Sequence, residues 1–209
     1  MSKKLLIVAA TSAELKITFE HFNLSDKAFV QTTDFDILIT GVGMTATAYA
    51  LGKHLNNNYH LVLNVGIAGS FDQNIPLGTV VNINHDTFSE LGAEDHDNFI
   101  TIEELGFGTN SALATAKIAE LPNVSGITVN KVHGNSESIQ LIKQRFNVQT
   151  ESMEGAAVFY ACNQESLLCA QVRAISNYVV PRNKEDWKIG LAIHNLNNWL
   201  ISFLSDTNR

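Results

Sequence analysis

The chain has 209 residues, enough for a single α/β domain spanning 1–209 with a large buried core. It carries 14 basic and 21 acidic residues, a net charge of −7, which argues against nonspecific binding to nucleic acid or to anionic membranes. We therefore expect a small-molecule partner, with no nucleic acid and no membrane. The two cysteines, Cys162 and Cys169, lie in apolar stretches and predict buried reduced thiols in a cytoplasmic protein.

An apolar run near the start of the chain predicts a buried strand from Leu5 to Ala10, followed by a helix over residues 12–22. Thr11-Ser-Ala-Glu14 matches the S/T-x-x-E capping box, in which the glutamate bonds back to the first amide of the helix. Glu14 therefore has an ordinary explanation as a capping residue. The alternative is a general base, because Glu14 directly follows a central strand, where it could deprotonate a water molecule.

Glycine-rich segments follow the next two predicted strands. Gly41-Val-Gly43 comes after a strand at 36–40 and before a helix that runs to residue 55, and Gly66-Ile-Ala-Gly-Ser70 comes after a strand at 61–65. We expect two tight turns that face one crevice, since glycine lets the backbone approach a ligand closely. Ordinary tight turns without a ligand are the alternative.

The same two segments bear on which ligand is bound. Gly41-Val-Gly43 could open a dinucleotide site, but Asn64 stands in the following strand where such a site needs an acidic residue. A phosphate dianion is best held by arginine, and we expect none of the four arginines to lie near either glycine segment. These are Arg145, Arg173, Arg182 and Arg209. This absence favours water over phosphate as the nucleophile.

After a strand at 79–83, residues 84–110 show no periodic pattern and predict a long polar loop, of the kind that often forms a lid or binding loop. Its histidines and acidic residues make a metal site conceivable, but no fixed ligand spacing supports one. Residues 111–121 have the alanine-rich character of a helix, and 124–132 that of a strand that leads to His133. His133 could stack on a base or be a solvated turn residue. An amphipathic helix is expected over 137–146.

Residues 151–178 hold most of the polar residues that we assign to a site. A helix is expected from Met153 with Met153, Ala156, Ala157, Tyr160 and Ala161 on its buried face and Glu154 in its first turn, where an anion is stabilised. A strand at 170–175 then breaks at Ser176-Asn177-Tyr178, and polar groups at such strand ends often bind ligands.

The last predicted helix spans 186–204. Its buried stripe is expected to hold apolar residues, with His194 and the asparagines facing away from the sheet. The members of the stripe are Ala192, Leu196, Trp199, Leu200 and Phe203.

Several of these motifs resemble those of a known family. The Met153-Glu154 pair at a helix start and the Ser176-Asn177 pair at a strand end are similar to those of the nucleoside phosphorylase and nucleosidase superfamily. Within it, three segments resemble futalosine hydrolases: 151–156, 173–178 followed by Pro181-Arg182, and Leu91-Gly-Ala-Glu-Asp95. The resemblance covers almost the whole chain. It implies a three-layer α/β fold with a central mixed β-sheet flanked by helices.

The resemblance also implies roles for single residues. It implies that Glu14 activates water and that Glu154 binds the ribose hydroxyls, with Met153 packed against the sugar. It also implies that Asn177 binds the purine and that residues 91–95 contact the acyl side of the substrate. The further substrate-binding residues that it implies are Gly43, Gly69, Val132, His133, Ser152 and Ser176. It implies no metal and no cofactor, and a homodimer or larger homo-oligomer.

Asn177 carries the prediction about the base. Adenine-specific nucleosidases have aspartate at the matching position, whereas an asparagine can donate to a 6-oxo group and accept from a protonated N7. Asn177 therefore favours hypoxanthine, the base of futalosine, over adenine; a structural turn asparagine is the alternative. The other functions left open are a purine nucleoside phosphorylase, a methylthioadenosine or adenosylhomocysteine nucleosidase and a noncatalytic nucleoside sensor. Arg182 is either a partner for a substrate carboxylate or a surface residue.

Overall fold

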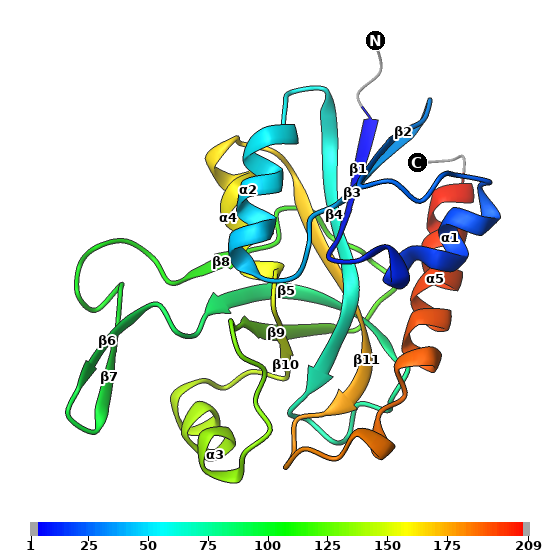
Figure 1. Cartoon of the computed structure of the whole chain (residues 1–209). Helices are drawn as coiled ribbons and strands as arrows, with labels where there is room; N and C mark the ends of the chain where they lie inside the picture. Colours follow the sequence, from blue (N-terminus) through cyan, green and yellow to red (C-terminus); the bar gives the residue numbers. More distant parts are fainter. Residues whose placement is uncertain (1–3, 207–209) are drawn as a thin grey trace.

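A large mixed β-sheet forms the centre of the protein, whose structure is a computed structural model that describes residues 4–206 (Figure 1). The strands of this sheet are β1 (Lys4–Ala9), β2 (Phe29–Gln31), β3 (Phe35–Ile39), β4 (Tyr59–Ser70), β5 (Val80–Phe88), β8 (Ser111–Leu113), β9 (Asn123–Thr128), β10 (Thr150–Ser152) and β11 (Cys169–Tyr178). Their order is β10-β9-β5-β11-β4-β1-β3-β2, with β8 paired to β5. β4 is parallel to β1 and β11, while β11 is antiparallel to β5.

One end of this sheet closes on itself. β10 is parallel to β9 and also pairs antiparallel with β4, where Glu151 lies opposite Gly69. Strands β4, β11, β5, β9 and β10 thus form a closed ring, which brings β10 and β11 to opposite sides of β4. Residues far apart in the sequence therefore meet around the end of β4.

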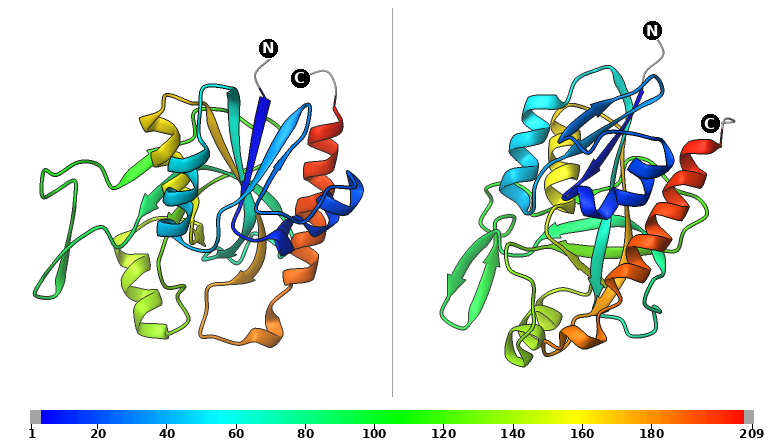
Figure 2. Two further views of the ribbon diagram at one scale, coloured as in Figure 1. Left: turned by 45° about the horizontal axis from the view of Figure 1, so that its top comes forward. Right: turned by 45° about the vertical axis from the view of Figure 1, so that its right-hand side comes forward.

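Helices cover both faces of the sheet and make the two outer layers (Figure 2). They are a 3-10 turn at Ser12–Leu15, α1 (Lys16–His21), α2 (Met44–His54), α3 (Ser136–Arg145), α4 (Gly155–Gln164), a 3-10 turn at Lys184–Asp186 and α5 (Ile189–Ser205). α1 and α5 share one hydrophobic cluster with the sheet, and α2 and α4 share another on its opposite face. The expected three-layer α/β fold with a central mixed sheet is confirmed.

Two expected turns are parts of strands. β4 continues through the glycine-rich segment 66–70, and β11 continues through Ser176, Asn177 and Tyr178 with a register shift between Ile175 and Asn177. Glycine-rich segments predict turns, but these two strands pair with each other along this whole length. Tertiary pairing therefore overrides the local preference of glycine for turns.

The segment after residue 83 also differs from expectation. β5 runs on to Phe88, because Asp86 and Thr87 are buried with partners inside the sheet. Residues 92–101 then form an exposed hairpin of β6 (Gly92–Asp95) and β7 (Asn98–Thr101) rather than a structureless loop. Residues 111–121 are not helical. Ser111–Leu113 pair with β5, and that pairing outweighs the helix propensity of the alanines.

The helices bury residues that differ in part from those predicted. In α4 the side chain of Tyr160 is exposed, and Val158, Phe159 and Cys162 are buried instead. In α5 the expected stripe faces the core, but Asn197 is fully buried as well. Its Nδ2 donates to the Glu14 carbonyl at 2.8 Å, so a buried polar residue ties α5 to the turn that carries Glu14.

Both cysteines are buried free thiols, as predicted. No helix within residues 4–206 is long and apolar enough to cross a bilayer.

Candidate active site

The predicted site residues gather around one cavity of about 410 Å³. Those that line it are Glu14, Gly69, Val132, His133, Ser152, Met153, Glu154, Ser176 and Asn177. They come from the turn after β1, from β4, from the loop after β9, from β10 and the residues that follow it, and from the end of β11. The sheet topology brings these segments together. A second cavity of about 440 Å³ lies at the opposite end of β1 beside Leu5 and contains none of these residues.

Glu14 both caps a helical turn and lines the cavity. Its Oε2 accepts hydrogen bonds from the backbone N–H and the hydroxyl of Thr11, each at 3.0 Å, and its Oε1 accepts from the N–H of Ile67 at 3.1 Å. The capping and site interpretations are therefore compatible. Burial raises the pKa of Glu14 above its ordinary value, and the charge of Arg173 offsets part of that rise.

Glu154 is held from two sides. It is the N-cap of α4 rather than a first-turn residue, and its Oε1 accepts from the N–H of Gly43 at 3.0 Å. Gly43 has a φ of +95°, which glycine adopts without strain. Gly43 does not line the cavity itself but positions a carboxylate that does. The other carboxylate oxygen lies 3.7 Å from Nη2 of Arg173.

Arg173 corrects the expectation that no arginine lies near the glycine segments. Its side chain is fully buried beside Gly66, where an added Cβ would lie 2.1 Å from its Nη1 and 2.8 Å from Oε1 of Glu14. Gly66 thus leaves the space in which a guanidinium and a carboxylate meet. Sequence separation concealed this contact, because Arg173 lies on β11 directly opposite Gly66 on β4.

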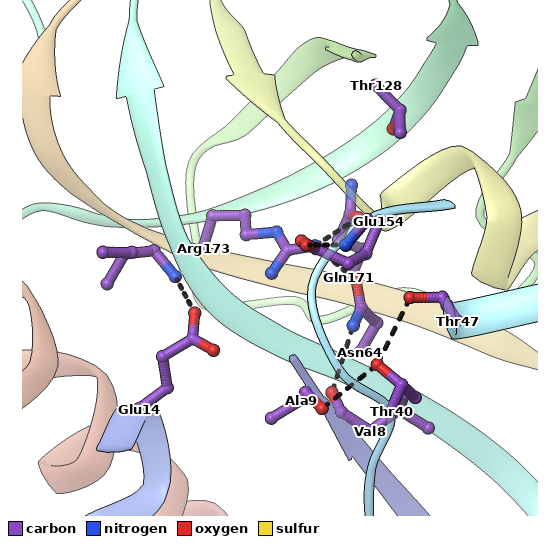
Figure 3. A network of polar contacts seen from close by, with 12 residues as sticks. Val8, Ala9, Glu14, Thr40, Thr47, Asn64, Thr128, Glu154, Gln171 and Arg173 are labelled. Atoms are coloured by element: carbon purple, nitrogen blue, oxygen red, sulfur yellow. Dashed lines mark hydrogen bonds and ion pairs between the residues drawn. The ribbon is translucent and has the colours of Figure 1, made fainter. Parts of the chain in front are cut away.

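Behind Arg173 lies a chain of buried hydrogen bonds (Figure 3). Nη2 of Arg173 donates to Asn64 Oδ1 at 2.6 Å and to Gln171 Oε1 at 3.2 Å, and Gln171 Nε2 donates to Asp86 Oδ2 at 2.8 Å. Asp86 also accepts from the hydroxyl of Thr128 at 2.9 Å. Burial raises the pKa of Asp86 to about 6, although these donors oppose the rise.

Asn177 presents its carboxamide to the cavity in a defined orientation. Its Oδ1 accepts from the Ser176 hydroxyl at 2.8 Å and its Nδ2 donates to the Tyr178 carbonyl at 3.1 Å. One N–H and one acceptor site of the carboxamide are left for a ligand.

His133 is fixed by Glu151, so the interpretation of a solvated turn histidine is wrong. Its backbone N–H donates to Glu151 Oε1 at 2.9 Å, its ring Nδ1 contacts Oε2, and its side chain is only 10% exposed. Glu151 lines the cavity and was not predicted as a site residue. Its signal in the sequence was weak, because a glutamate just before a helix is common on electrostatic grounds alone.

Arg182 and Trp187 also line the cavity, with the guanidinium carbon 4.8 Å from the centre of the indole ring. Arg182 is thus exposed and also borders the cavity. The segment 91–95 does not reach the cavity, contrary to expectation, because it pairs with β7 in the exposed hairpin. Among residues 4–206, no group of three or more histidine, cysteine, aspartate or glutamate side chains could hold a metal ion.

Comparison with known proteins extends this description. A model of the phosphorylase superfamily matches residues 9–203. The chain is 33% identical to futalosine hydrolase of Streptomyces coelicolor over 173 residues, which cover 76% of this chain and 74% of that protein. It is 31% identical to futalosine hydrolase of Acidothermus cellulolyticus, with 94% of this chain and 88% of that protein covered. The 5′-methylthioadenosine/S-adenosylhomocysteine nucleosidase of Helicobacter pylori has the same fold, with a TM-score of 0.83, 15% identity and 99% of each chain covered.

Proposed function

Because the chain belongs to the phosphorylase superfamily and is a purine nucleosidase of the branch that contains methylthioadenosine nucleosidases and futalosine hydrolases, we propose that it hydrolyses futalosine. The products are hypoxanthine and dehypoxanthine futalosine, which places the reaction in menaquinone biosynthesis. The observation that carries the proposal is the shared cavity of Glu14, Glu154 and Asn177, which supplies groups for the water, the ribose and the base.

In the proposed reaction, Glu14 takes a proton from water as its oxygen attacks C1′ of the ribose and the bond from C1′ to N9 breaks. Positive charge builds on the sugar at this stage, so hydrogen bonds from the ribose hydroxyls to the Glu154 carboxylate strengthen. The departing purine takes a proton on N7 from solvent, because the carboxamide of Asn177 is too weak an acid to transfer one. Asn177 accepts from this N7–H and donates to O6.

Water is favoured over phosphate for an electrostatic reason. Arg173 does not line the cavity itself, but it faces Glu154 at 3.7 Å and is close to Glu14, and both of these carboxylates line it. A phosphate dianion bound near Arg173 would be repelled by the carboxylates of Glu14 and Glu154, because the single positive charge of Arg173 is already shared between them. Arg182, which lines the cavity, is the cation available to a carboxylate on the substrate.

The test is purine release by the purified protein from futalosine, inosine and methylthioadenosine, each with and without phosphate. Hypoxanthine from futalosine at a rate independent of phosphate supports the proposal. Turnover that requires phosphate would make the protein a phosphorylase, and adenine from methylthioadenosine as the main product would make it a nucleosidase of the other kind. Binding without turnover of any nucleoside would indicate a sensor.

A further inference from the structure

Gly69 lies between two polar side chains on the floor of the cavity. It is the register partner of Glu151 on β10 and of Asn177 on β11, and all three residues line the cavity. Residues opposite one another in paired strands direct their side chains to the same face, so Glu151 and Asn177 flank a strip of bare backbone. Adjacent strands lie about 4.8 Å apart, which separates the two flanking backbones by about 10 Å. This gap suits a flat bicyclic ring.

The floor is kept open by the glycine. A Cβ at position 69 would lie 2.9 Å from Cγ2 of Val179 and 3.2 Å from Nδ2 of Asn177. A side chain there would displace the carboxamide and occupy the space above the strand. Gly69 thus allows a ring to reach both polar groups at once.

Glu151 offers only hydrogen-bond acceptors to that ring. Residue 151 is 3% exposed, and both of its oxygens face His133, one at the backbone N–H and one at Nδ1. A carboxylate has about four lone-pair sites, so roughly two remain for a ligand. A ring N–H can fill such a site, whereas a ring nitrogen with a lone pair would be repelled.

We propose that Glu151 accepts a hydrogen bond from the N1–H of the purine and thereby selects a 6-oxopurine over a 6-aminopurine. The proposal rests on the proposed function, because it takes Asn177 to lie at N7 and O6 of the base. A 6-oxopurine carries a proton on N1, and adenine carries a lone pair there. Glu151 and Asn177 thus recognise two edges of the same base, and each disfavours adenine independently.

The first test needs no variant of the protein. Binding of hypoxanthine, adenine and 1-deazaadenine to the wild-type chain is measured by calorimetry; the last replaces N1 of adenine with C–H and so removes the lone pair. We expect hypoxanthine to bind most tightly and 1-deazaadenine to bind at least about tenfold more tightly than adenine, as one repulsive contact is removed. Adenine that binds as tightly as 1-deazaadenine would overturn the proposal.

The second test compares Glu151→Gln with a matched control, Glu90→Gln. Glu90 is an exposed glutamate that accepts from the N–H and Nδ2 of Asn130, both at 2.9 Å, and does not line the cavity. A glutamine at 151 can donate to N1 of adenine, so kcat/KM for adenosine relative to inosine is expected to rise at least about tenfold. The control is expected to leave this ratio unchanged.

A role for Glu151 in holding His133 alone would lower both kcat/KM values equally and leave the ratio unchanged, which would overturn the proposal. If Glu151→Gln does not fold, the affinities of the wild type for hypoxanthine, adenine and 1-deazaadenine test the proposal instead. Failure of the proposed function has a different result, namely no hypoxanthine release from any nucleoside by the wild type. The affinity order of the bases still tests Glu151 in that case.

Discussion

Arg173 and Glu154 face each other at 3.7 Å in a fully buried part of the site, with Glu14 on the other side of the same guanidinium. One cation is thus shared by the carboxylate proposed to activate water and the carboxylate proposed to bind ribose. The arrangement links three segments that are distant in the sequence. Its consequences can be tested one residue at a time.

Glu14→Gln is expected to lower kcat by about 10²- to 10⁴-fold, because the carboxamide cannot take a proton from water. Affinity for hypoxanthine should change little, since the base lies at Asn177. Purine release and calorimetric binding of hypoxanthine measure the two effects separately. A variant with nearly normal turnover would show that Glu14 serves only as the cap of its helical turn.

The pH dependence of the same residue has a definite sign. Burial raises the pKa of Glu14, so its active, deprotonated form is gained only as the pH rises through that raised value. Activity should therefore fall on the acid side at a pH above the usual range of glutamate. Because the charge of Arg173 lowers this pKa, Arg173→Gln should move the acid limb of kcat/KM to higher pH. A limb that stays in place would contradict the coupling.

Gly66→Ala is expected to damage the site, because its Cβ would lie 2.1 Å from Arg173 Nη1 and 2.8 Å from Glu14 Oε1. Overpacking of this kind costs about 1–3 kcal/mol of folding stability, and displacement of both charged groups should lower kcat by more than about a hundredfold. Gly52→Ala is the matched control, since nothing lies within 4 Å of a Cβ in this helix. It should stabilise the protein by about 0.5–1 kcal/mol. Equal behaviour of the two variants would contradict the packing described.

Asp86→Asn tests the buried chain behind Arg173. Asp86 accepts from Nε2 of Gln171 and so orients the Gln171 side chain with its Oε1 toward Arg173. An asparagine at position 86 can donate to Gln171 Oε1 instead, which would turn the Gln171 carboxamide around. The loss of a hydrogen bond to a charged group, about 1.5–3 kcal/mol, should lower kcat by about ten- to a hundredfold. Wild-type kcat in this variant would show that the chain does not position the site.

The same variant has a signature in stability. The pKa of Asp86 is about 6 in the folded state and its ordinary value is 3.8, so the folded state holds the proton more tightly. The wild type should therefore lose about 3 kcal/mol of stability as the pH rises from about 4 to about 6. Denaturant unfolding at several pH values measures this loss. The share that Asp86 causes should be absent from Asp86→Asn, whereas the share caused by the raised pKa of Glu14 should remain. A slope that is unchanged in the variant would assign the whole loss to other groups.

Much of the fold could be predicted from the sequence, because apolar runs and helical periodicity report burial directly. The β1 strand, α3 and the stripe of α5 followed from such patterns. The errors arose where pairing between distant strands decided the structure. Residues 111–113 lie in an alanine-rich stretch and still form a strand, and Gly66 lies in a strand because β4 pairs with β11 at this position.

The candidate site was predictable where a residue follows a strand end or matches a family motif, as for Glu14, Glu154 and Asn177. Glu151 and Arg173 were missed as members of the site for the same physical reason. Each acts through a partner from a different segment of the chain, Glu151 with His133 and Arg173 with Glu154, and no local pattern encodes such a contact.

The central claim is that the site cleaves a hypoxanthine nucleoside with water, and a competition measures it most directly. Futalosine and methylthioadenosine are mixed at equal concentration with the purified protein, with and without phosphate, and both free bases are quantified at early times. Their ratio equals the ratio of the two kcat/KM values. We predict at least about a hundredfold excess of hypoxanthine over adenine, the same in both buffers. An excess of adenine, or release of hypoxanthine only with phosphate, would contradict the claim.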